Sequence, residues 1–201
     1  MVEYTIYMKQ ERPGPITPTR LEAFSDGVLA VIITITALEI KPPPGDTLSA
    51  LHTVIPLFLA YLLGFTFIGI YWNNHHHLLR SSRRISGTVM WANLHLLFWL
   101  SLIPAATVWA GEFPGDAWPA AVFGCIGFMS GIAYYILSRT LIHADNPKLK
   151  RQLGRDTKGI ISQVLYALGI GLAFIHPLLA YGVYALISIM WFIPDRRLED
   201  S

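Results

Sequence analysis

One carboxylate in this sequence lies where a carboxylate is costly. Asp26 belongs to the stretch RLEAFSDGVLAVIITITALEI, residues 20–40, which is otherwise largely apolar. An ionised group in such surroundings is strongly destabilising unless it is paired. Histidines are suitable partners, because an imidazole can donate a hydrogen bond to a carboxylate or exchange a proton with it. The run His75–His77 and the more distant His95 supply such groups.

The three consecutive histidines also raise the question of a metal site. Successive side chains on a helix are splayed by about 100°, so three neighbours cannot all face one ion. The remaining histidines are scattered along the chain, at positions 52, 95, 143 and 176. The pattern therefore predicts no metal site and no cofactor, and a membrane enzyme that binds iron or zinc is the disfavoured alternative.

The composition indicates that the lipid bilayer is the solvent of this chain. Of the 201 residues, 53% are hydrophobic and only 14% are charged, whereas a soluble domain is about a quarter charged. The net charge of +2 gives no indication of a nucleic-acid partner. We expect an all-α polytopic membrane protein with six transmembrane helices, because six segments approach the roughly 20 apolar residues that a crossing needs. They are residues 20–40, 48–72, 88–110, 117–138, 158–176 and 177–194.

Two prolines mark where this helical pattern breaks. Pro104 interrupts the third segment, which a membrane helix tolerates when its neighbours satisfy the freed carbonyl groups. Pro177 follows His176 at the junction of the last two segments and suits the first position of a new helix. We therefore expect a tight helical hairpin at this junction.

The basic residues predict the orientation of the chain. All lysines and arginines except Lys41 fall on one side of the six predicted helices. Because short cytoplasmic loops carry the excess of Lys and Arg, both termini are predicted to be cytoplasmic, in a multi-pass protein of the plasma or inner cell membrane. Residues 1–19 and 195–201 are then cytoplasmic tails, and residues 20–194 form the transmembrane domain.

Three common devices of membrane transport are absent from the sequence. It contains no GxxxxGK[ST] or GxGxxG stretch, no helix with arginine at every third position and no TVGYG-type run. These absences argue against nucleotide-driven transport, a voltage sensor and a carbonyl-lined potassium filter within this chain.

The first predicted helix has two chemically different faces. At about 100° per residue, an apolar stripe about 100° wide forms on one side, and Asp26 and Ser25 point about 140° and 120° away from its centre. The stripe comprises Arg20, Phe24, Gly27, Val31, Thr34, Ile35 and Leu38.

Depth in the membrane suggests partners for Asp26. The second predicted helix reaches the cytoplasmic side at Asn73 and His77, which share a helical face, and the third begins there with His95 close by. We therefore predict a buried polar cluster of Asp26 with His77, His95 and Arg20, within a polar network that also includes Phe24, Ser25 and Asn73.

The residues Arg20, Phe24, Ser25 and Asp26 match the R-x-x-x-F-S-D signature near the start of the first helix in the transmembrane-protein-175 family. These are endolysosomal potassium channels of animals and their bacterial and archaeal relatives, which the chain also resembles in its six-helix plan and length. The resemblance implies a potassium-permeable channel whose pore is lined by the first helix. Animal members carry two six-helix repeats, whereas this chain is similar to the prokaryotic form, which implies a homotetramer in the bilayer with K⁺ as the permeant ion.

The resemblance also assigns roles by position. In the family a bulky apolar residue five positions after the motif aspartate forms the main constriction; the residue here is Val31, smaller than the isoleucine or leucine expected. Thr34 or Ile35, and then Leu38, follow on the next turns of the pore face. The motif's polar residues, which hold the first three helices together in the family, correspond to Arg20, Ser25 and Asp26.

Other readings remain open from the residues alone. Apolar stripes are common on membrane helices that simply pack inside a bundle. A proton-coupled secondary transporter could use Asp26 and the nearby histidines as a proton relay. A carrier saturates and couples to a proton gradient, whereas a channel shows discrete single-channel currents. An inert scaffold or assembly factor is a further alternative.

Overall fold

The chain folds as a bundle of α-helices. The computed structural model describes residues 17–82, 84–144 and 156–192, and within these ranges it contains no strand. This confirms the predicted all-α class. The helices are α1 (Pro18–Leu38), α2 (Ile55–Arg80), α3 (Gly87–Ser101), α4 (Ile103–Glu112), α5 (Ala117–His143), α7 (Thr157–Ala173) and α8 (Pro177–Phe192), and a 3-10 helix, η1 (Leu48–Thr53), precedes α2.

The first two helices begin where prolines and capping residues place them. Thr17 caps α1 by accepting a hydrogen bond from the backbone N–H of Arg20. Pro18 occupies the first turn of α1, and Pro56 the first turn of α2. A proline is tolerated at these positions because its missing N–H would have no partner within the helix.

The predicted apolar segment 48–72 starts before α2 and stops before its end. Its apolar start belongs to η1, because Leu48 and Leu51 precede the proline-marked beginning of α2. Helix α2 continues to Arg80 and so includes all three consecutive histidines. Hydropathy alone ends the segment too early, because a helix satisfies its backbone groups whatever the polarity of its side chains.

The third apolar segment is broken near Leu102, as Pro104 predicted. Pro104 lies in the first turn of α4, directly after the end of α3. Proline lacks the N–H that the carbonyl of Leu100 would accept, and its ring crowds that carbonyl. The two helices together still form one apolar span of 26 residues.

Four spans of the described residues are long and apolar enough to cross a bilayer: α1, α2, α3 together with α4, and α5. Helices α7 and α8 are shorter, with 17 and 16 residues. The chain turns between them at His176-Pro177, where the sequence predicted a helical hairpin.

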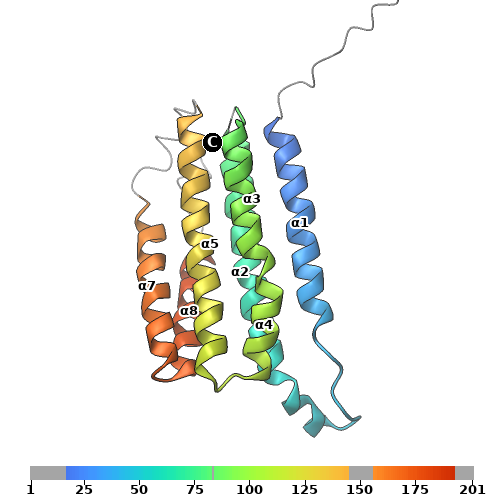
Figure 1. The fold of residues 1–201 in the computed structure, drawn as a ribbon. Coiled ribbons are helices and arrows are strands. Elements are labelled where there is room, and N and C mark those ends of the chain that lie inside the picture. The colour runs from blue at the N-terminus through green and yellow to red at the C-terminus, as the bar shows by residue number, and fades with distance from the viewer. Residues whose placement is uncertain (1–16, 83, 145–155, 193–201) are drawn as a thin grey trace, which may run out of the picture.

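The helix ends gather at two sides of the bundle (Figure 1). The start of α1 and the end of α5 lie at one side, which we call the basic end, and η1 and the α7–α8 turn lie at the other. The described cations of the basic end are Arg20, Arg80, Arg84, Arg139 and Lys158. The opposite end carries Glu39, Lys41, Asp46, Glu112 and Asp116. The remaining basic residues of the predicted topology, and most of both predicted tails, lie outside the described residues.

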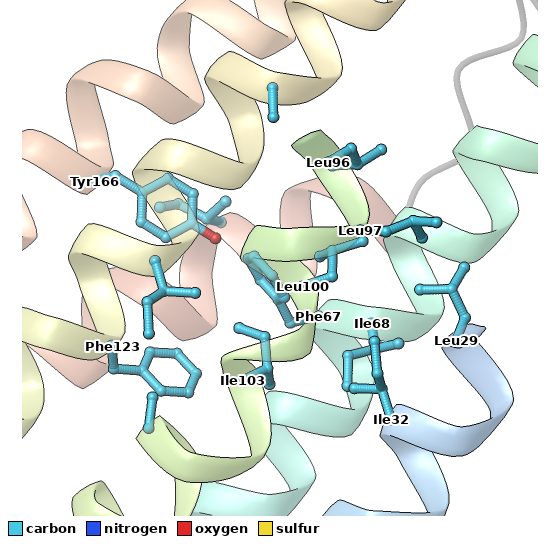
Figure 2. Packing of buried hydrophobic residues seen from close by; sticks show 14 of the residues in the cluster. Leu29, Ile32, Phe67, Ile68, Leu96, Leu97, Leu100, Ile103, Phe123 and Tyr166 are labelled. Atoms are coloured by element: carbon cyan, nitrogen blue, oxygen red, sulfur yellow. The ribbon is translucent and has the colours of Figure 1, made fainter. Parts of the chain in front are cut away.

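One apolar core runs through the bundle (Figure 2). Leu29 and Ile32 of α1 lie beside Ile68 of α2, and the core continues through Ile103 of α4 to Phe123 of α5. Lipid tails are as apolar as these side chains, so a bundle in a bilayer is held mainly by close packing and by hydrogen bonds between helices. The quality of packing therefore matters more than the amount of apolar surface buried.

Glycines allow α5 to approach α7 closely. A Cβ atom added to Gly127 would lie 2.5 Å from a ring carbon of Tyr166. One turn further along α5, a Cβ added to Gly131 would overlap the side-chain amide of Gln163. Small residues at such positions let helix backbones come together in a membrane.

Replacing Gly127 with leucine should lower the stability of the bundle by about 1–3 kcal/mol, because the added side chain overpacks against Tyr166. The expected result is a lower melting temperature of the purified protein in detergent micelles. Gly171→Leu is the control, because Gly171 of α7 faces open space and this variant should melt like the original chain. Equal melting temperatures of the two variants would contradict the close α5–α7 contact.

Candidate functional site

Helix α1 divides into a face packed on its own bundle and a face that is not. The packed face consists of Leu21, Ser25, Leu29, Ile32 and Thr36. The other face carries Phe24, Val31, Ile35 and Leu38, whose exposed fractions are 53%, 56%, 45% and 76%. Thr34, Gly27 and Arg20 are exposed on the same side. The stripe that the sequence predicts is therefore not used for packing within the chain.

A buried chain of hydrogen bonds holds the packed face of α1. The hydroxyl of Ser25 donates to the carbonyl of Leu21 at 2.9 Å and accepts a hydrogen bond from Nδ2 of Asn93, also at 2.9 Å. Oδ1 of Asn93 lies 2.7 Å from Nε2 of His75. The exposed fractions of Ser25, Asn93 and His75 are 0%, 0% and 1%. One amide of α3 therefore links α1 to α2 in a fully buried position.

This geometry fixes the tautomer of His75. An amide oxygen can only accept, so Nε2 of His75 must carry the proton. Nδ1 of His75 is then a bare acceptor, and it is buried without a hydrogen-bond partner. The imidazole therefore acts here as a hydrogen-bond donor to Asn93.

A second set of contacts joins α1 directly to α2. Oδ1 of Asp26 accepts a hydrogen bond from Nε1 of Trp72 at 3.1 Å. One turn earlier in α1, the carboxylate of Glu22 lies 2.5 Å from Nδ1 of His76. The rings of Trp72 and His76 stack with their centroids 6.2 Å apart. Because each pair is spaced by four residues, the two contacts form neighbouring rungs between the same two helices.

The predicted partners of Asp26 differ from those observed. Asp26 contacts Trp72, and neither His77 nor His95 hydrogen-bonds to it. His95 instead accepts a hydrogen bond from Trp99 in its own helix, at 3.0 Å. The ring of His77 packs edge-on against His76.

Two further predicted members also lie apart from this cluster. Asn73 is exposed, and the Arg20 guanidinium makes no hydrogen bond or ion pair within the described ranges. Side chains at the same depth in the membrane can still point in different directions. The rotation of each helix about its own axis decides which of them contact Asp26.

The sequence prediction missed His75 and Asn93, although helical periodicity indicates that both are buried. The buried positions of α2 include Gly64, Ile68 and Leu79, and His75 falls on the same repeating stripe. Asn93 lies on the buried stripe of α3 in the same way. A polar residue on the packed stripe of a membrane helix needs a polar partner. In the structure, His75 and Asn93 are partners of each other.

The exposed face of α1 borders an open groove of about 990 Å³ between α1 and α4. Phe24, Val31 and Ile35 line it from α1, and Pro104 and Val108 line it from α4. The carboxylates of Glu39 and Glu112 stand at the end opposite the basic end. Among the described residues, no three His, Cys, Asp or Glu side chains lie close enough together to hold a metal ion.

Comparison with known proteins identifies the family. A model of the family described as endosomal/lysosomal potassium channel TMEM175 matches residues 20–104. A potassium channel of Chryseobacterium sp. (strain P1-3) is 48% identical over 188 residues, which cover 92% of this chain and 98% of that protein. The chain belongs to the TMEM175 family. This confirms the family that the R-x-x-x-F-S-D signature indicated.

The fold agrees with a solved TMEM175 structure. The crystal structure of a lysosomal potassium-selective channel TMEM175 homolog from Chamaesiphon minutus is similar with a TM-score of 0.79 and 27% sequence identity, over 89% of this chain and 97% of that chain. The mouse endosomal/lysosomal proton channel TMEM175 is 31% identical over 147 residues, which are 65% of this chain but 30% of the mouse protein. The segment matched by the TMEM175 family model runs from Arg20 to the break at Pro104, and so includes Ser25, His75 and Asn93.

Replacing Asn93 with leucine should destabilise the packing of α1. The substitution leaves the donor of His75 without its acceptor in a buried site, at a cost of about 1–3 kcal/mol, and removes the hydrogen bond to Ser25. We expect a lower melting temperature in detergent micelles.

Asn73→Leu is the matched control for this experiment. Asn73 is exposed on α2 and makes no hydrogen bond within the described ranges, so the change should alter stability by less than about 0.5 kcal/mol. If Asn93→Leu melts no lower than Asn73→Leu, the buried chain does not anchor α1.

Proposed function

We propose that this chain is the subunit of a potassium-permeable channel in which four copies surround a pore lined by α1. Relatives that cover almost the whole chain are named potassium channels, and the similar crystal structure is titled a potassium-selective channel. The observation that carries the proposal is the exposed stripe of α1. A helix anchored by buried hydrogen bonds on one face, with its apolar face left uncovered, is suited to meet copies of itself around an axis.

In this proposal the stripe forms successive rings along the pore. Val31 forms the main constriction, and Ile35 and Leu38 form apolar rings toward the opposite end. A narrow apolar ring disfavours water and therefore restricts passage to ions that shed part of their hydration. Selectivity then depends on what replaces the lost water.

Thr34 supplies the polar element of this face. Its hydroxyl donates to the carbonyl of Ala30 at 2.8 Å, so the proton points along the helix. The lone pairs of Oγ1 are therefore available to a partner beside the helix. Four such oxygens around an axis would offer a partly dehydrated K⁺ transient ligands next to the constriction.

The acidic groups at the end opposite the basic end fit a cation pathway. Glu39 ends the stripe and Glu112 ends the groove, so their charges would raise the local concentration of cations near the pore mouth. We also propose six crossings with cytoplasmic termini in the cell membrane. The orientation rests on the described cations, which lie at one end of the bundle. Helices α7 and α8 would complete the six crossings as a short hairpin.

The alternative of a proton-coupled transporter receives less support from the geometry. A relay through Asp26 needs a titratable neighbour in hydrogen-bond contact, and the observed partner of Asp26 is the indole of Trp72. Single-channel recording of the purified protein in planar bilayers distinguishes the two, because a carrier gives no discrete current steps. Purified protein that passes no K⁺ in liposomes would defeat the channel proposal.

Val31→Ala should weaken discrimination between K⁺ and Na⁺. Widening the constriction lets ions pass with more of their water, so we expect relative Na⁺ permeability to rise about three- to tenfold, which equals about 0.7–1.4 kcal/mol. Reversal potentials with K⁺ and Na⁺ on opposite sides of a bilayer measure this ratio. Leu186→Ala, on the exposed face of α8, should leave the ratio unchanged. An unchanged permeability ratio in Val31→Ala would show that Val31 does not form the constriction.

Thr34→Val should lower K⁺ conductance, because it replaces the hydroxyl with a methyl group of similar size. We expect a decrease of about tenfold if the ring of oxygens contributes about 1.4 kcal/mol to the passage of the ion. Thr36→Val is the matched control, since Thr36 makes the same bond to its own helix, to Ile32 at 2.7 Å, but is buried. A similar conductance in both variants would show that the Thr34 hydroxyl takes no part in conduction.

A further inference from the structure

We propose that a second cavity, on the side of α2 away from α1, binds a single-chain lipid amphiphile with an uncharged, hydroxyl-bearing headgroup. The cavity lies between α2, α5, α7 and α8 and has a volume of about 330 Å³, within the range of small-molecule sites. This inference goes beyond the proposed conduction and does not depend on it.

The walls of the cavity are mainly apolar and aromatic. Phe67 of α2, Tyr166 of α7 and Trp191 of α8 contribute aromatic rings. Ile160 and Val164 of α7 line the cavity and are also more than half exposed, so they mark an edge that opens to the surroundings of the bundle. Water alone is a poor occupant of such a space, because a water bound to the few polar groups leaves most of the 330 Å³ and its apolar walls unfilled. An alkyl chain that enters between Ile160 and Val164 matches the apolar walls.

Two polar groups in the cavity lack partners. Oε1 of Gln163 is buried without a hydrogen bond, a state that costs about 1–3 kcal/mol. The hydroxyl of Tyr71 makes no hydrogen bond within the described ranges. Both lie against Gly131, since a Cβ added there would overlap Gln163 and lie 3.6 Å from the Tyr71 oxygen. A ligand hydroxyl can donate to the amide oxygen of Gln163 and accept from the phenol of Tyr71.

The charges around the cavity favour an uncharged headgroup. Neither Gln163 nor Tyr71 provides a countercharge for an ion. At the basic end of the cavity the carboxylate of Asp156 caps α7 by accepting from the N–H of Gly159 at 3.0 Å, so a ligand carboxylate or phosphate there would meet a like charge. The ammonium of Lys158 lies 5.8 Å from the centre of the Trp191 ring, which opposes a cationic ligand at the same end.

Photolabelling of the full chain in nanodiscs tests this site. The probe is a monoacylglycerol with a diazirine in its acyl chain, and the crosslinked peptides are identified by mass spectrometry. We expect saturable labelling of α7 and α5 around Gln163 and Gly131. Excess unlabelled monoacylglycerol should compete, whereas lysophosphatidic acid, free fatty acid at pH 9 and an alkyltrimethylammonium of equal chain length should compete at least about tenfold less well.

Two variants test the polar contacts. Gln163→Leu and Tyr71→Phe should each lower saturable labelling about fivefold, the effect of one lost hydrogen bond. Neither should unfold the protein, because Gln163→Leu removes a buried acceptor that has no partner and Tyr71→Phe removes a hydroxyl without a hydrogen bond. Tyr181→Phe is the control, since the hydroxyl of Tyr181 is also buried and unpartnered but lies outside the cavity, and its labelling should be unchanged.

A third variant tests the entry. Ile160→Trp should block the edge of the cavity and abolish saturable labelling, whereas Leu168→Trp, on an exposed part of α7 outside the cavity, should not. The proposal is overturned if labelling is not saturable, if all variants label equally, or if a charged competitor is the strongest. Because labelling does not require ion flow, a failed channel assay and a failed binding assay are separate results.

Discussion

The rotation of α1 about its own axis is set by a short, buried chain of hydrogen bonds. Asn93 reaches from α3 to Ser25 of α1, and the same amide holds His75 of α2. A rotation of α1 by one residue, about 100°, would bring Phe24 or Asp26 to the place of Ser25 and break this chain. Apolar contacts in lipid discriminate weakly between rotations, so the polar contact decides which residues of α1 face outward.

The direct contacts between α1 and α2 act in the same direction. Asp26 and Glu22 bind Trp72 and His76 on one side of α1, away from the exposed stripe. The carboxylate that first drew attention in the sequence thus orients its helix against α2. The two carboxylates therefore lie away from the exposed face, which beyond Arg20 at the start of α1 is apolar apart from the hydroxyl of Thr34.

The sequence predicts what depends on one helix alone. The two faces of α1 follow from periodicity, and the break near Leu102 and the turn at His176-Pro177 follow from the chemistry of proline. Properties that involve two helices were harder to predict. From their depth in the membrane, His77 and His95 were predicted to lie near Asp26. The rotation of α2 instead buries His75 against Asn93 of α3, and His77 lies outside this contact.

The start of α2 shows a related limit. Leu48 and Leu51 are as apolar as a membrane segment, yet they belong to η1, because hydropathy measures solubility in lipid and does not report where the backbone turns. The proline in the first turn of α2 was the better indicator of that boundary.

The break between α3 and α4 separates two kinds of contact that hold α1. Asn93 of α3 hydrogen-bonds to the half of α1 near the basic end, whereas among the described residues no hydrogen bond joins α1 to α4, and these two helices meet through packing contacts. The half of α1 near the basic end is therefore held by hydrogen bonds between helices, and the far half, where Ile32 and Thr36 are buried, is held by packing. Because proline removes a backbone hydrogen bond at the break, α4 is free to take a direction of its own where it packs on α1.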